Sequence, residues 1–200
     1  MKRVSLIFLV MLAVVAFGFV SCVSQPAGST SEGSSTAASA PPSDMPDFYL
    51  NPPLADDAIY GVGSAKMAKL DTSRKMAVAR AREDIAFQMN ASIKAAITDY
   101  AQEAGVDGNN QVISFVETIS KQVTQTTLNG AKTEQVAAGK DGTVYALVSY
   151  PLNAFKDEVK KEFVRNEDAA FAEFKADQAM QKLDAELSNN PPKSGNVKGE

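Results

Sequence analysis

The sequence predicts an α+β fold with a small sheet and two long helices, one alanine-rich and one C-terminal. Three observations favour this class. A short strand pattern over 58–65 comes directly before helical periodicity over 72–104. Two further strand patterns, 132–138 and 143–150, flank a four-residue turn that suits a hairpin. A final helical run extends from 153 to about 187.

The N-terminal segment has the pattern of an export signal. Lys2 and Arg3 form a short positive start, and residues 4–20 are almost entirely apolar. About 18 apolar residues can span a bilayer. However, Ser21 and the chain's only cysteine, Cys22, follow at once, and this favours a processing site. An uncleaved anchor and ordinary signal cleavage are the alternatives.

The residues around Cys22 resemble a bacterial lipobox, roughly Leu-Ala/Ser-Gly/Ala-Cys. Val20 and Ser21 fit this pattern, whereas Phe19 departs from the usual Leu, as in lineages with a relaxed lipobox. The resemblance implies a signal peptide over 1–21, a diacylglycerol on the Cys22 sulfur, and an acyl group such as palmitate on its amine. Three acyl chains give stable membrane attachment.

Two further features bear on location and partners. Val23 instead of Asp after the cysteine favours export to the outer membrane. Removal of Lys2 and Arg3 leaves 18 basic residues against 24 acidic ones, a formal charge of −6. Such a chain suits neither nucleic acid nor anionic lipid surfaces. We therefore expect the lipid to hold it in the cell envelope, facing the periplasm or the cell surface.

Composition divides the mature chain into three parts. Residues 22–45 carry the lipidated cysteine and a Ser/Pro/Gly tether, which buries too little apolar surface to order and spans about 25 Å. One domain is predicted over 46–188, and a frayed, disordered tail over 189–200. The domain opens with Phe48, Tyr49 and Leu50 between prolines, which predicts an extended strap across the domain.

The strand at 58–65 contains Gly61-Val62-Gly63, which resembles part of a phosphate-binding loop. Ser64 to Met67 follow, without the third glycine of a dinucleotide fingerprint or the Gly-Lys-Ser/Thr of a P-loop. Tight packing of the strand on a helix is the favoured interpretation.

The alanine-rich helix is predicted from Thr72 to Ala104, with Asp71, Thr72 and Ser73 as candidate N-caps and Gly105 as the stop. One face is apolar, which is typical of core: Val78, Ile85, Ala86, Met89, Ile93, Ala96, Ile97 and Tyr100. Arg82 lies in this apolar face. Either its aliphatic stem is buried and its guanidinium reaches solvent, or the guanidinium is buried in an ion pair or a ligand contact. Phe87 lies on the polar face, packed under the strap or another helix or forming an oligomer interface.

Two later segments leave alternatives open. Residues 111–127 carry a helical apolar stripe but also a strand-like composition, and helix is favoured. The C-terminal run is expected to form one helix capped by Asn153. Its apolar stripe changes direction along the helix, and the second part of the stripe is an edge formed by Met180, Leu183 and Leu187. Either that edge projects as a contact for another copy, or a kink near Glu167 or Asp177 folds it back onto the domain.

Catalysis finds little support in the composition. The chain has no histidine and one cysteine, which excludes Ser-His and Cys-His catalysis, histidine or cysteine metal sites, and intrachain disulfides. The acid pairs Asp56-Asp57 and Glu83-Asp84 match no catalytic motif and are expected to be solvated. No enzyme activity, cofactor or metal is expected.

The order of features resembles LPP20-type lipoproteins over residues 46–155. The matching segments are 46–49, 59–65, 79–86 and 141–148, with Phe48 where the family often has Trp. The resemblance implies a strand–helix–strand–strand core with an antiparallel sheet in a lipid-anchored envelope protein. Relatives include surface antigens and flagellar-motor accessory proteins. It favours a structural or assembly role, with self-association or an envelope or flagellar partner; a ligand-binding lipoprotein is the alternative.

Overall fold

The computed structural model describes residues 44–106 and 110–194 of the chain. They belong to one compact unit, Ala40–Glu200; the other unit, Met1–Ser39, and with it the predicted signal, Cys22 and most of the tether, lies outside the described residues. The elements in chain order are α1 (Asp47–Leu50), β1 (Ala58–Ala65), α2 (Leu70–Glu103), α3 (Asn110–Gly130), β2 (Lys132–Ala138), β3 (Val144–Pro151), α4 (Leu152–Asn166), a 3-10 turn (Glu167–Ala169) and α5 (Ala176–Asn189).

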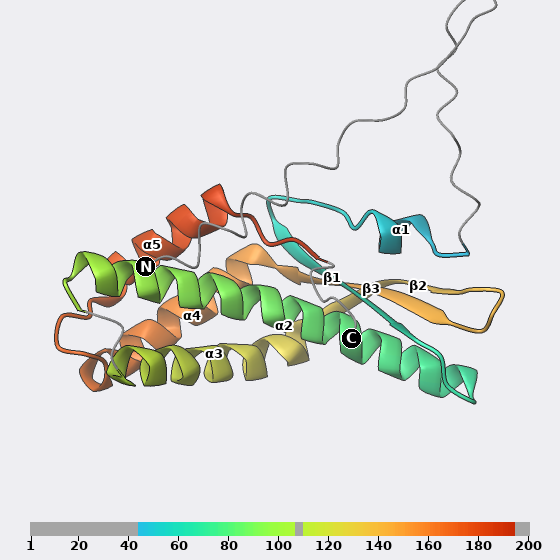
Figure 1. The fold of residues 1–200 in the computed structure, drawn as a ribbon, viewed down its shortest axis with the longest axis horizontal. Coiled ribbons are helices and arrows are strands. Elements are labelled where there is room, and N and C mark those ends of the chain that lie inside the picture. The colour runs from blue at the N-terminus through green and yellow to red at the C-terminus, as the bar shows by residue number, and fades with distance from the viewer. Residues whose placement is uncertain (1–43, 107–109, 195–200) are drawn as a thin grey trace, which may run out of the picture. The chain divides into compact units, whose positions relative to one another are not determined.

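The α+β prediction is confirmed. The three strands form one antiparallel sheet in the order β1-β3-β2, and all three lie where the sequence predicted strands. The long helix α2 crosses one face of this sheet, and α3, α4 and α5 pack beside it (Figure 1). The core cluster begins at Ile59 and ends at Leu187, so a fragment from Ala40 onward contains every core residue that the structure describes, and we expect this fragment to fold by itself.

The two glycines of β1 face α2, and there is no room for a side chain at either. A Cβ built on Gly61 would lie 2.2 Å from the Ala81 carbonyl oxygen, and one on Gly63 would lie 2.3 Å from the Ala77 carbonyl oxygen. Backbone therefore packs directly on backbone. The interpretation of Gly61 and Gly63 as close-packing residues is confirmed.

The alanine-rich helix forms as predicted and begins two residues earlier. Seven of the eight residues predicted for its core face are buried, and Val78 is half-buried. The predicted stop is correct: Gly105 has φ +71°, and the Val106 N–H donates to the Ala101 carbonyl across it. The cap prediction is wrong, because Lys69 is the N-cap and makes no side-chain cap bond. Ser73 instead is buried and accepts the Met67 N–H at 2.9 Å.

Residues 111–127 are helical, which confirms the favoured alternative.

The strap that the sequence predicted to be extended contains one helical turn, α1, which follows Pro46 and ends before Pro52. Tyr49 of this turn packs edge-on against Tyr145 of β3 at 4.9 Å between ring centroids. Tyr145 is outside the cluster that its neighbours Val144 and Ala146 share with α2. Since strand side chains alternate, α1 covers the sheet face opposite α2.

The prediction of one long C-terminal helix is wrong, and the kinked alternative is what the structure has. The helix breaks after Asn166, and Phe171 and Phe174 in the break join an aromatic cluster with Tyr100, Phe115 and Phe163. The chain then reverses into α5.

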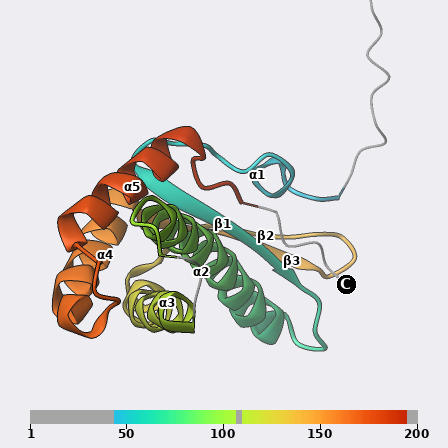
Figure 2. The same ribbon diagram turned by 60° about the vertical axis from the view of Figure 1, so that its left-hand side comes forward.

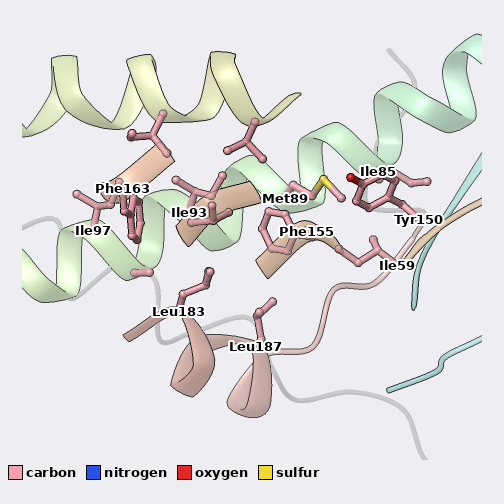
Figure 3. Close-up of a cluster of buried hydrophobic side chains, with 14 of the residues drawn as sticks. Ile59, Ile85, Met89, Ile93, Ile97, Tyr150, Phe155, Phe163, Leu183 and Leu187 are labelled. Carbon is pink, nitrogen blue, oxygen red and sulfur yellow. The ribbon is translucent and has the colours of Figure 1, made fainter. Parts of the chain in front are cut away.

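Because of this reversal, the edge predicted to project is covered. Leu183 and Leu187 are buried and point from α5 toward the core side chains of α2 and α4 (Figure 3), while Met180 is half-buried. Ion pairs between Lys182 and Glu103 and between Lys156 and Asp184 flank the contact. Because the helix breaks, the apolar side chains of α4 and those of α5 both reach one core, which a single straight helix would not allow.

We expect Gly63→Ala to destabilise the domain by about 3 kcal/mol and to lower its melting temperature by roughly 10 °C, because the added methyl meets helix backbone that cannot rotate away. Thermal unfolding of the 40–200 fragment measures this. Val62→Ala, on the opposite face of the same strand, should have a clearly smaller effect. Equal melting temperatures for Gly63→Ala and the parent would contradict the close contact.

Candidate functional site

Three polar side chains of α2 bind the outer edge of β1. The Arg80 guanidinium donates to the Ser64 carbonyl at 2.6 Å, and the Val62 N–H donates to Asp84 at 3.1 Å. One turn further, the Gln88 amide donates to the Tyr60 carbonyl at 2.8 Å. We call these three residues the edge ladder.

The spacing of the edge ladder follows from helix and strand geometry. Four helical residues rise about 6 Å, and two strand residues rise about 6.6 Å. A helix that lies against a strand in the opposite direction can therefore place every fourth side chain beside every second backbone group. Three backbone groups on the free edge of β1 are therefore already hydrogen-bonded by α2, which disfavours pairing with an added strand.

Asp84 is the most deeply buried member, with 2% of its surface exposed. Besides the Val62 N–H, its carboxylate accepts the hydroxyl of Ser194 at 2.7 Å. The first part of the predicted tail, residues 189–194, thus completes α5 and returns to α2. A buried carboxylate needs such donors, because transfer out of water without them is strongly unfavourable.

A groove of about 670 Å³ lies beside this edge. It separates the strap from α2, and its lining mixes apolar and charged residues: Tyr49, Leu50, Pro52, Val62, Gly63, Ser64, Arg80, Glu83, Asp84, Phe87 and Ser194. The hydroxyls of Tyr49 and Ser64 are 3.2 Å apart and tie the strap to β1. The groove therefore offers both apolar and charged groups to anything that enters it.

The other edge of the sheet is β2, and its surroundings differ. Six of its seven residues are exposed, including Val136 at 38%. The pairing with β3 shifts between Thr133 and Gln135, so Glu134 forms a bulge. Glu134 accepts the Ser149 hydroxyl at 2.7 Å and pairs with Lys132, and these contacts lower the pKa of its carboxyl.

The hairpin between β2 and β3 is held by its predicted turn residues. Gly142 has φ +85°, a conformation suited to glycine. Asp141 accepts both the hydroxyl and the N–H of Thr143, and with Lys66 nearby its pKa falls to about 2. The carboxylate is therefore charged at any physiological pH, and the turn is fixed.

The two acidic pairs singled out in the sequence lie in different surroundings. Asp56 and Asp57 are exposed, as is Glu83, so the expectation of solvated acids holds for these three. It is wrong for Asp84, whose burial in the edge ladder the sequence signalled only through polar residues recurring every fourth position. The lipidation candidate, Cys22, lies outside the described residues.

Arg82 and Phe87 have different surroundings. Arg82 is half-buried, and its guanidinium donates to the Ala131 carbonyl at 3.5 Å, a contact to backbone and not to an acid. Phe87 is 57% exposed and lies at the groove with Leu50 and Pro52 of the strap. The strap thus reaches Phe87 without covering it.

Within residues 44–106 and 110–194, no group of three or more His, Cys, Asp or Glu side chains could hold a metal ion. Among the helices of the same ranges, none combines the length and apolarity needed to cross a membrane. No protein-family model matches the chain, and no curated protein matches it.

Asp84→Ala removes the acceptor of the Val62 N–H, and we expect the Val62 amide to exchange with solvent roughly 30-fold faster, equivalent to about 2 kcal/mol for a bond to a charged group. Hydrogen exchange followed by NMR measures it. Glu83→Ala, which removes the neighbouring exposed carboxylate, is the matched control and should leave the exchange rate unchanged. The same acceleration in both variants would show that Asp84 does not hold the edge.

Proposed function

We propose that the chain is a lipid-anchored cell-envelope protein whose folded domain acts as a structural assembly module rather than as an enzyme. The single observation behind this is the difference between the two sheet edges. The edge ladder occupies the backbone of β1, whereas β2 is exposed along most of its length. An exposed strand edge is a template for pairing with another chain.

A second copy of this chain is the partner that suits β2 best. Lys132 and Glu134 lie two residues apart on this strand, carry opposite charges and are both at least partly accessible. In an antiparallel pair of β2 strands, the lysine of each copy runs alongside the glutamate of the other. The surface is therefore complementary to itself, as a two-fold interface requires. The bulge at Glu134 restricts the geometry and disfavours unspecific pairing.

The sequence supports the envelope location. The lipobox-like Phe19 to Cys22 favours a lipid anchor, the 23 residues that follow favour a tether, and Val23 favours the outer membrane. The resemblance to LPP20-type lipoproteins points the same way and suggests association with the flagellar motor as one setting. The domain would then be held near the bilayer and free to meet its neighbours.

A ligand-binding lipoprotein or surface antigen is the second candidate, and the groove between α1 and α2 favours it. The two proposed functions predict different solution masses for the folded domain. A ligand-binding module works as a monomer, while an assembly module associates through β2.

Cys22→Ala in the full chain should release the protein from membranes into the aqueous phase of a detergent partition and abolish labelling by radioactive palmitate. The reason is that the cysteine sulfur and amine are the sites of the proposed acyl chains, and the net negative charge of the mature sequence does not favour binding to anionic lipid. Ser21→Ala keeps a small residue before the cysteine and should remain membrane-bound. Unchanged partitioning of Cys22→Ala would contradict the anchor.

Val136→Lys should lower the solution mass of the 40–200 fragment to that of a monomer, because a charge on an edge strand opposes strand pairing. Sedimentation equilibrium measures the mass. Val164→Lys is the matched control: the same exchange at an exposed valine, on α4 instead of β2. A parent fragment that is monomeric at all concentrations, or an equal effect of both variants, would contradict assembly through β2.

A further inference from the structure

We propose that the exposed face of α2 binds the same face of a second copy of this chain in an antiparallel helix pair. Four residues form this face, Met76, Arg80, Glu83 and Phe87, and we call them the helix seam. This second contact rests on the proposed assembly function and extends it. The helix seam lies on α2 and not on β2, so either contact can fail without the other.

The helix seam is a narrow exposed stripe on a helix that has neighbours on both sides. α2 lies between α3 on one side and β1 and α5 on the other (Figure 2). All four seam residues are exposed, and Phe87 is 57% exposed although it is a large apolar side chain. With 3.6 residues per turn they fall within an arc of about 60°. Their spacings of four, three and four residues are those at which the contact residues of paired helices recur.

The order of residues makes the helix seam complementary to itself. An apolar residue stands at each end, and two opposite charges stand between them. In an antiparallel pair whose two-fold axis passes midway between Arg80 and Glu83, each arginine faces the partner's glutamate. Met76 then faces the partner's Phe87, because these two residues have the same midpoint on the helix. A parallel pair would instead place like charges opposite each other, so the charges favour the antiparallel arrangement.

The side chains have groups available for these contacts. One guanidinium nitrogen of Arg80 donates to the Ser64 carbonyl at 2.6 Å, and the guanidinium has further N–H groups that suit a carboxylate. Leu50 of the strap is 49% exposed and lines the same groove as Phe87, so the partner's Met76 meets apolar groups from two elements. Methionine packs favourably against aromatic rings.

The contact extends over about three turns of α2 and is small. The next positions of the stripe, Lys69 and Lys94, face each other across the pair, and their long exposed side chains turn to solvent. So few residues do not hold a dimer in dilute solution, since a standard interface buries about 800 Å² per partner. The helix seam therefore pairs copies that are already concentrated, as on the membrane proposed above. Together with pairing through β2, it joins dimers into larger assemblies.

Cysteine cross-linking tests the pairing in cells that express the full chain, with diamide as the oxidant. The double variant Met76→Cys/Phe87→Cys should give at least about fivefold more covalent dimer than either single variant, because each cysteine faces the other position of the partner. In the single variants, identical positions lie about 16.5 Å apart along the axis, too far for a disulfide. The parent is the control for Cys22, which all variants share.

Two outcomes of the cross-linking would contradict the arrangement. If the double variant gives no more dimer than the single variants, the helix seams do not pair. If it gives a ladder of larger products that the parent lacks, the contact is not two-fold, because a two-fold contact is complete with two copies.

Charge exchange in the double-cysteine variant tests the central pairs. Glu83→Arg should lower the dimer yield at least about threefold, because it sets arginine against arginine, and adding Arg80→Glu should restore the yield. Since Glu83 is exposed, its exchange keeps the fold. Glu117→Arg is the matched control: the same exchange at an exposed glutamate, on α3 instead of α2. Equal yields for Glu83→Arg and Glu117→Arg would overturn the charge pairing.

Val136→Lys in the double-cysteine variant separates this contact from the one through β2. It should leave the yield of covalent dimer unchanged, because Val136 lies on β2 and the cross-link joins α2 to α2. An unchanged yield together with a parent fragment that is monomeric in solution would remove β2 and keep the helix seam. Loss of the covalent dimer with Val136→Lys would overturn the helix seam as a separate contact.

Discussion

The direct contact between the backbone of α2 and the backbone of β1 is the constraint on which the rest of the structure depends. It exists because Gly61 and Gly63 carry no side chain where the helix carbonyls approach. A helix lying this close to a strand brings its polar side chains, including the short Asp84, within reach of the strand edge. Had alanine stood at either position, the helix would have to move outward, and the bonds from Asp84 and Gln88 would lengthen beyond useful range.

The contact also decides which parts of the sheet remain available. Closing β1 with side chains from α2 leaves β2 as the edge that faces outward, protected only by a bulge and by charges. The same edge ladder provides the buried carboxylate of Asp84, to which the chain returns at Ser194. The contact between α2 and β1 thus leads to two different surfaces. One is the exposed edge strand β2, and the other is the groove of apolar and charged residues beside β1.

Most of the fold could be predicted from periodicity, and the errors have physical causes. The strands and the core face of α2 follow from local patterns, since apolar spacing is a property of neighbouring residues. The break after Asn166 was only one of two alternatives that the sequence left open, because helical propensity continues through it and the long-range aromatic cluster around Phe174 decides between them. Asp84 was expected in solvent, since its donors Val62 and Ser194 lie 22 and 110 residues away in the chain.

Burial of Phe171 and Phe174 has a further consequence for the C-terminal part. By drawing the chain inward between α4 and α5, these rings turn α5 back along α2, so that Leu183 and Leu187 complete the core. The direction of α5 then sends the following residues toward Asp84 and the strap, and a straight helix would have carried them away. The aromatic cluster at the C-terminal end of α2 therefore determines which residues reach the groove beside the middle of this helix, although no residue of the cluster lines the groove.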